Sequence, residues 1–204
     1  MRTTPLVELT RRRAIEDVAS ELFREHGYAA TSVRDIARAL DMQGASLYAH
    51  VTSKEDVLWA IVDRTASRFE AAAAEVLDST GAVPGQSDPA ATLTRLVRAH
   101  VRVIAEDVEA AGVFVHEWRA LGEERRAGVL SRRDTYERRF RDLIEEGMSS
   151  GDFALTDSSL AATAVLSALN GLPAWYDPAG RLTADRVADH FVEFTLGMLQ
   201  GASR

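Results

Sequence analysis

The chain of 204 residues contains no cysteine, which excludes disulfides, thiolate zinc sites, iron–sulfur clusters and cysteine nucleophiles. It has only five prolines and 46% hydrophobic residues, so its composition is not that of a disordered or collagen-like chain. No apolar run approaches the roughly 18–20 residues of a membrane span, and the charged N-terminal stretch lacks the apolar region of a signal peptide. We expect one or two domains, a cytoplasmic location and no membrane partner.

Positive charge is also scarce, because 24 Lys and Arg stand against 31 Asp and Glu, a net charge of −7. The deficit is uneven along the chain. Residues 1–54 hold eight cations, including the single lysine Lys54, against seven acids, which gives a net charge of +1. Residues 55–204 hold 16 arginines against 24 acids, which gives −8. This asymmetry is compatible with two functional parts, of which only the first is nearly neutral.

Hydrophobic periodicity is helical along nearly the whole chain, which predicts an all-α fold. Ile15, Ala19 and Phe23 mark one face of a first long helix, and Gly27 follows as its stop signal. The stretch 79–89 is dense in Gly, Pro and Ser, which predicts a loop. We expect helices at about residues 8–26, 33–40, 45–50, 53–78, 89–106, 108–121, 124–147, 157–171 and 184–200.

Two of the predicted helices are short, and they follow the first long helix closely. Residues 33–40, 41–43 and 44–50 have the lengths of the two helices and the turn of a helix-turn-helix motif, whose second helix enters the DNA major groove. Leu40 and Leu47 are apolar and can hold the two helices together. Thr52 and Glu55 have the T-x-x-E spacing of a capping box that opens the next helix. A plain three-helix bundle, with the polar residues only solvated, is the alternative interpretation.

The sequences T-S-V-R-D-I-A at 31–37 and G-A-S-L-Y-A-H-V-T-S-K-E-D-V-L at 44–58 resemble the DNA-binding domain of the tetracycline-repressor (TetR) family of bacterial transcription regulators. The resemblance covers about residues 10–60, and its L-Y-x-H and S-K-E-x-[LV]-L elements occur together at the family's spacing. It implies a three-helix DNA-binding domain over 1–54 and a larger helical domain for ligand binding and dimerisation over 55–204. The long helix at about 53–78 links the two.

The chain departs from the family pattern in and after the turn. Asp41 replaces the turn glycine, Gln43 stands where a Ser or Thr usually caps the second helix, Ala45 replaces a glycine, and Val51 replaces a phenylalanine. Aspartate is one of the few residues that tolerate a left-handed backbone, so we expect the turn to be retained. The other changes bear on base preference.

The resemblance implies which residues face DNA. Gln43 is suited to a bidentate contact with adenine, whereas Tyr48 and His50 are better suited to phosphates. Lys54 stands in the first turn of the next helix, where backbone N–H groups and an ammonium can hold a phosphate. An ordinary surface role is the alternative for Arg34. The complete predicted DNA-binding set is Arg34, Gln43, Gly44, Ala45, Ser46, Tyr48, His50 and Lys54.

In the family, the C-terminal domain dimerises through its last two long helices and encloses a small-molecule pocket. The resemblance therefore places a homodimer interface on helices 157–171 and 184–200. Some of the apolar residues on these helices can instead fill the core of one protomer. The predicted interface residues are Leu160, Ala164, Leu166, Phe191, Phe194, Thr195 and Met198.

The stretches 116–121 and 169–182 mix aromatic and polar residues, as ligand pockets do. Both resemble a subgroup of the family that responds to acyl-coenzyme A thioesters. Arg119, Arg132, Arg133 and Arg139 have the guanidinium chemistry to meet coenzyme phosphates, although a solvated, salt-bridged helix face is the ordinary interpretation of such arginines. The predicted ligand-binding residues are His100, His116, Trp118, Arg119, Tyr136, Phe140, Asn170 and Trp175.

Motifs of catalysis do not occur in the sequence. The His116-Glu117 pair lacks the second histidine of H-E-x-x-H, and there is no G-x-S-x-G or G-x-G-x-x-G. We expect no enzymatic activity, no cofactor and no metal site. The sequence predicts a ligand-responsive regulator of the repressor type, which binds a palindromic double-stranded DNA operator as a homodimer and is released by a small-molecule effector. The alternative is an all-α ligand-binding protein with a vestigial helix-turn-helix.

Overall fold

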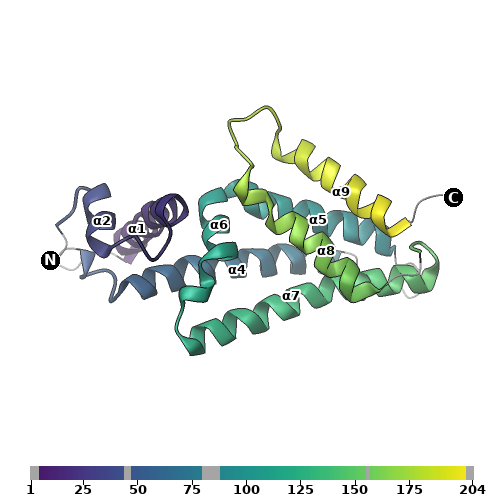
Figure 1. Cartoon of the computed structure of the whole chain (residues 1–204), viewed down its shortest axis with the longest axis horizontal. Helices are drawn as coiled ribbons and strands as arrows, with labels where there is room; N and C mark the ends of the chain where they lie inside the picture. The colour runs from purple at the N-terminus through teal and green to yellow at the C-terminus, as the bar shows by residue number, and fades with distance from the viewer. Residues whose placement is uncertain (1–4, 44–46, 80–87, 155–156, 201–204) are drawn as a thin grey trace. The chain divides into compact units, whose positions relative to one another are not determined.

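The computed structural model describes residues 5–43, 47–79, 88–154 and 157–200, and these residues form helices and no strand (Figure 1). The all-α prediction is confirmed. The chain divides into two compact units: unit one comprises residues 1–66 and 109–130, and unit two comprises residues 67–108 and 131–204. The functional boundary expected at residue 54 differs from this division and stays a prediction. Among the described helices, none has the length and apolar character that a membrane span requires.

Unit one is built on the helix α1 (Pro5–His26) and the short helix α2 (Val33–Ala39). Helix α1 is followed directly by Gly27, which has a φ of 82° and donates its N–H to the Phe23 carbonyl at 2.9 Å. Helix α2 begins with a capping box, because the Ser32 hydroxyl accepts from the Asp35 N–H while the Asp35 carboxylate accepts from the Ser32 N–H. Phe23 and Ile36 are fully buried, so both helices contribute to one core.

The start of helix α4 (Lys54–Ser79) also belongs to unit one. The capping box expected at Thr52 and Glu55 is wrong by one residue. The helix begins at Lys54, and the Ser53 hydroxyl accepts from the Asp56 N–H at 3.0 Å and donates to the Asp56 carboxylate at 2.9 Å. The Glu55 carboxylate therefore takes no part in the cap and accepts hydrogen bonds from other residues of unit one.

The remainder of unit one is α6 (Val108–His116), the 3₁₀ helix η1 (Trp118–Ala120) and the start of α7 (Glu123–Ser150). The single helix predicted over 108–121 is wrong, because α6 ends at His116. The backbone then tightens to three-residue hydrogen bonds, with Leu121 N–H donating to the Trp118 carbonyl at 3.2 Å. This tighter winding buries both Trp118 and Leu121, which are 5% and 2% exposed.

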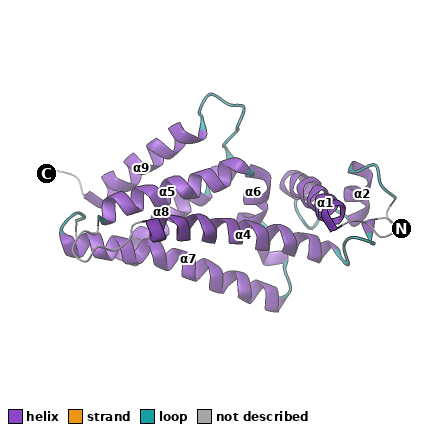
Figure 2. Ribbon diagram, turned by 180° about the vertical axis from the view of Figure 1, so that it is seen from behind, coloured by secondary structure: helices purple, strands orange, loops and turns teal. Residues whose placement is uncertain are grey.

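Unit two contains the rest of α4 and α7 together with α5 (Pro89–Glu106), α8 (Ser158–Asn170), η2 (Leu172–Ala174) and α9 (Ala184–Gln200). Helix α9 packs along α5, as both views show (Figures 1 and 2). Asp88 caps α5 by accepting from the Ala91 N–H at 2.8 Å, and Pro89 stands at the first helical position. Leu93, Leu96 and Ile104 of α5 have no exposed surface, so this helix forms the centre of the unit-two core.

Candidate functional site

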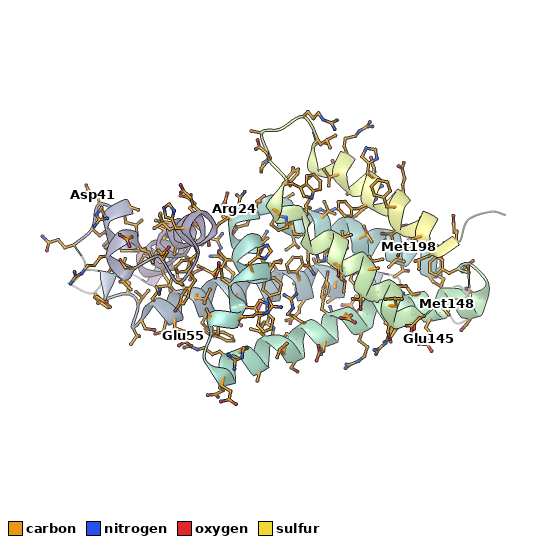
Figure 3. All side chains as sticks on the ribbon, viewed as in Figure 1. Arg24, Asp41, Glu55, Glu145, Met148 and Met198 are labelled. Carbon is orange, nitrogen blue, oxygen red and sulfur yellow. The ribbon has the colours of Figure 1, made fainter. Side chains whose placement is uncertain are left out.

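The turn after α2 is closed by Asp41, just beyond the end of the helix (Figure 3). Asp41 has a φ of 52°, in the left-handed region that the sequence predicted for it. This conformation lets the Met42 N–H reach back to the Ala37 carbonyl at 2.9 Å and satisfy the end of α2. The prediction that aspartate would preserve the turn is therefore confirmed.

The predicted DNA-reading residues lie on the surface next to this turn. Gln43 and Arg34 are exposed and line one groove, together with Asp41 and Met42. Leu47 is fully buried and its N–H donates to the Gln43 carbonyl at 3.3 Å, so it anchors the segment from inside.

Beyond Leu47, Tyr48 is 56% exposed and His50 is half-buried. The structure assigns a helical position to Leu47 and a turn to residues 48–50. The remaining predicted DNA-binding residues, Gly44, Ala45 and Ser46, lie outside the described residues.

Lys54 has a different setting from the phosphate contact that the sequence suggested. Its ammonium donates to the backbone carbonyls of Tyr28 at 2.7 Å and Thr31 at 2.8 Å. The same nitrogen lies 4.1 Å from the centre of the Tyr28 ring. The side chain is thus engaged by the protein itself, within unit one.

Long-range ion pairs also hold unit one together. Arg24, labelled in Figure 3, is 2.5 Å from Glu109 and so joins α1 to α6. Arg125 of α7 is 2.6 Å from Asp56 of α4, and this contact together with the Ser53 hydroxyl lowers the pKa of the Asp56 carboxyl. The partners are up to 85 residues apart. Sequence analysis missed them because no local spacing relates such residues.

A polar and aromatic cluster lies inside unit two. His100 is 3% exposed, its Nδ1 is 3.1 Å from the Tyr136 hydroxyl, and its ring centre is 4.6 Å from that of Phe69. The rings of Tyr136 and Phe140 are 5.6 Å apart. The structure therefore brings together three predicted ligand-binding residues, His100, Tyr136 and Phe140, and adds Phe69. Phe69 was not among the residues predicted to bind ligand.

The ionisation of the cluster follows from its burial. Removal from water, helped by the positive charge of Arg133, lowers the pKa of His100 to about 3, so the ring is neutral. Burial also raises the pKa of the Tyr136 phenol, which keeps its proton. The His100 Nε2 is buried and makes no hydrogen bond within the described part of the chain. A buried ring nitrogen without a hydrogen-bond partner carries a desolvation cost.

Two family models match the chain. Residues 15–61 match the bacterial regulatory proteins of the tetR family, and residues 86–199 match the tetracyclin repressor-like C-terminal domain. The chain belongs to the TetR family. It is a transcriptional regulator with an N-terminal helix-turn-helix for DNA binding and a C-terminal ligand-binding domain.

Relatives support this assignment over nearly the whole length. The HTH-type transcriptional repressor KstR2 of Rhodococcus jostii (strain RHA1) is 31% identical over 195 residues, which cover 91% of this chain and 89% of that protein. The crystal structure of the TetR family regulator PfmR from Thermus thermophilus is 33% identical with a TM-score of 0.79, and the match covers 93% of this chain and 99% of that one. The crystal structure of AibR in complex with isovaleryl coenzyme A and operator DNA is 27% identical with a TM-score of 0.77. This match covers 90% of this chain and 97% of that one.

The other ligand-binding residues predicted for this TetR regulator are divided between the two units. His116, Trp118 and Arg119 belong to unit one, where the Arg119 guanidinium stacks 4.6 Å from the Trp118 ring. In unit two, Asn170 is half-buried and Trp175 is 56% exposed.

Two of the arginines proposed for coenzyme phosphates bind groups of the protein itself, as the ordinary interpretation expects. Arg132 pairs with Glu70 at 2.6 Å, and Arg139 donates to the Glu70 carbonyl at 3.2 Å. Both are thereby engaged on the surface between α4 and α7 of unit two. Arg119 instead stacks on Trp118 in unit one.

The residues predicted for dimerisation fall into two groups. Leu160 on α8 is 67% exposed, Phe194 on α9 is 70% exposed, and Met198, labelled in Figure 3, is 47% exposed. Ala164 is exposed, and Phe191 is half-buried with its ring parallel to that of Trp175. Leu166 and Thr195, in contrast, are buried among residues of their own protomer and face its core. The helical periodicity in the sequence had not separated the exposed face of α8 and α9 from their core-facing side at Leu166 and Thr195.

Proposed function

We propose that the protein is a homodimeric repressor that binds a palindromic operator and is released when an acyl-coenzyme A thioester occupies its C-terminal domain. The observation that carries the effector part is the unpartnered Nε2 of His100, buried among aromatic rings in unit two. The similarity to AibR, whose structure holds isovaleryl coenzyme A and operator DNA, supports both partners. The similarity to the repressor KstR2 supports the direction of regulation.

The DNA-reading surface in this proposal is the groove of Arg34 and Gln43 together with the segment that follows it. Gln43 is exposed at the end of the turn, where an amide can read an adenine edge. Tyr48, 56% exposed, and His50 supply phosphate contacts, and Arg34 adds a guanidinium from α2. Gly44, Ala45 and Ser46 complete the proposed surface from the sequence alone.

The effector site in this proposal uses the hydrogen-bonding capacity of the His100 cluster. Because the Tyr136 phenol keeps its proton, it can donate to Nδ1 of the neutral His100 ring. The ring then carries its own proton on Nε2, which is a donor suited to a carbonyl oxygen such as that of a thioester. Phe69 and Phe140 would surround the apolar part of the acyl group.

Dimerisation in this proposal uses the exposed apolar residues of α8 and α9. Leu160, Phe194 and Met198 are large and apolar, and such side chains gathered on two helices mark a surface that another chain covers. A two-fold dimer presents two recognition segments to successive major grooves, which requires a palindromic operator. Leu166 and Thr195 are left out of the proposed contact because they already fill the protomer core.

The response to effector requires two conformations with different operator affinities. Helix α4 contributes residues to both units, so a shift of this helix is the proposed link between the ligand and the recognition segments. A change in operator affinity caused by effector binding needs a coupling free energy of only about 1–3 kcal/mol between the two sites.

The test uses the full-length protein, the intergenic DNA upstream of its gene and a panel of acyl-coenzyme A thioesters that includes isovaleryl coenzyme A. We expect thermal stabilisation by at least one thioester, release of the DNA by the same compound, and loss of both effects in His100→Phe. The control is His190→Phe, which changes an exposed histidine of the same unit. Uniformly flat melting shifts across the panel would rule out the thioester, and absence of sequence-specific DNA binding would favour a ligand-binding protein without a DNA target.

A further inference from the structure

The ammonium of Lys54 connects two segments that are distant in sequence. Lys54 is the first residue of α4, and the carbonyls it binds, those of Tyr28 and Thr31, lie between α1 and α2. The two distances, 2.7 Å and 2.8 Å, are those of well-formed charge-assisted hydrogen bonds. Lys54 thus joins the start of α4 to the segment that precedes the helix-turn-helix.

That segment determines where α2 begins. Thr31 is 3% exposed and its hydroxyl donates to the Gly27 carbonyl at 3.0 Å, while the Tyr28 ring packs edge-on against Phe23 at 5.2 Å. The next residue, Ser32, is the N-cap of α2. A change in the position of Thr31 therefore changes the position of α2, because only one peptide bond separates Thr31 from the cap.

The chemistry of a lysine suits this arrangement. An ammonium has three N–H donors, and here two of them bind carbonyls while the nitrogen also lies over the Tyr28 ring. Non-helical carbonyls in a partly buried segment need donors, and a compact point charge on a long stem can reach two of them at once. A DNA phosphate at the same nitrogen would have to compete with these contacts.

We propose that Lys54 is a positioning residue, which locks the start of α4 to the segment between α1 and α2 and so fixes the helix-turn-helix for DNA, in place of contacting a phosphate itself. The inference rests on the DNA-binding function of the TetR regulator. It also couples α4 to α2, because a displacement of the Lys54 backbone must either move Tyr28 and Thr31 or break their hydrogen bonds to the ammonium.

The test compares Lys54→Met with Arg34→Gln, which removes a cation proposed to face DNA. Operator affinity is measured at several salt concentrations. For Arg34→Gln we expect the slope of log affinity against log salt to shrink by about 0.9, as loss of one phosphate contact requires. For Lys54→Met we expect affinity to fall about tenfold or more with the slope unchanged, because the charge does not meet a phosphate. A slope reduced equally in both variants would overturn the proposal.

A second measurement needs neither DNA nor effector, so it remains decisive if the operator is not found. Amide hydrogen exchange is followed in the full-length protein at residues 32–36, which open α2. We expect exchange about tenfold or more faster in Lys54→Met than in the wild type, and unchanged in Arg34→Gln. Unchanged exchange in Lys54→Met would refute the positioning role, whereas failure of DNA binding in the wild type would count only against the proposed function.

Discussion

The guanidinium of Arg125, in the first turn of α7, lies 2.6 Å from the carboxylate of Asp56, in the first turn of α4. The same guanidinium is 3.3 Å from Glu55, which also accepts from the Gly122 N–H at 3.1 Å. The start of α4 is therefore held on one side by residues 122–125 and on the other by the carbonyls that Lys54 binds. All of these contacts lie within unit one.

This arrangement predicts that Arg125 contributes to the effector response. In Arg125→Gln the start of α4 loses its charged contacts with α7, so effector binding should change operator affinity less than in the wild type. We expect the ratio of operator affinities without and with effector to fall toward one from a wild-type value of about 5–150. Titration of operator DNA by fluorescence anisotropy, with and without the effector, measures this ratio. The exposed neighbour Arg126→Gln is the control, and equal ratios in the two variants would contradict the prediction.

The buried His100 predicts a specific dependence of stability on pH. Its pKa is about 3 in the folded protein against an ordinary value of 6.5. Between pH 6.5 and pH 3 the imidazole is therefore protonated in the unfolded chain and neutral in the folded protein. The contribution of neutral His100 to the free energy of unfolding is complete above pH 6.5. It is lost as the pH falls toward 3, at up to about 1.4 kcal/mol per pH unit. His100→Phe should lack this loss.

Urea unfolding between pH 4 and pH 8 measures the effect as the difference between wild type and variant. His190→Gln, which changes an exposed histidine, should give a pH profile of the free energy of unfolding that runs nearly parallel to that of the wild type. A difference between wild type and His100→Phe that stays constant from pH 4 to pH 8 would show that His100 titrates normally.

Two glycines of α7 predict opposite effects of the same substitution. A β-carbon at Gly128 meets nothing within 4 Å, so Gly128→Ala should stabilise the helix by up to about 1 kcal/mol. A β-carbon at Gly147 would lie only 2.2 Å from the Phe153 ring, which is buried. Gly147→Ala should therefore destabilise the protein by about 1–3 kcal/mol through overpacking. Chemical denaturation measures both, and stabilisation by Gly147→Ala would contradict the packing of Phe153 on α7.

The exposed apolar residues of α8 and α9 predict a variant that does not dimerise. Phe194→Glu places a charge on the proposed interface, so the protein should sediment as a monomer and lose most of its operator affinity. Leu130→Glu is the matched control, because it replaces an exposed apolar residue of α7 outside that surface. Analytical ultracentrifugation distinguishes the outcomes, and a Phe194→Glu dimer as stable as the control would move the interface elsewhere.

The sequence was sufficient for features that depend on local signals. The Gly27 stop and the left-handed Asp41 each follow from the residue type at a fixed offset, and the structure shows both. The end of α6 was missed because Trp118 and Leu121 are apolar at a spacing that an α-helix also accommodates, and only packing selects the tighter 3₁₀ winding.

The candidate site was less accessible to sequence analysis. The His100 and Tyr136 pair was named, but its hydrogen bond and the unpartnered Nε2 depend on the packing of α5 against α7. The setting of Lys54 could not be foreseen, because its acceptors are backbone carbonyls, which no side chain in the sequence reveals. Arg125 was missed for a related reason, since its partner is 69 residues away.

The central claim is that this TetR regulator binds its operator as a dimer and releases it on binding a thioester. Fluorescence anisotropy of a labelled fragment of the upstream intergenic DNA, titrated first with the protein and then with isovaleryl coenzyme A and longer acyl homologues, tests it most directly. We predict sequence-specific binding that weakens with salt, and release by at least one thioester at concentrations where free coenzyme A has no effect. Binding that is equal on unrelated DNA, or a complex that every thioester leaves intact, would contradict the claim.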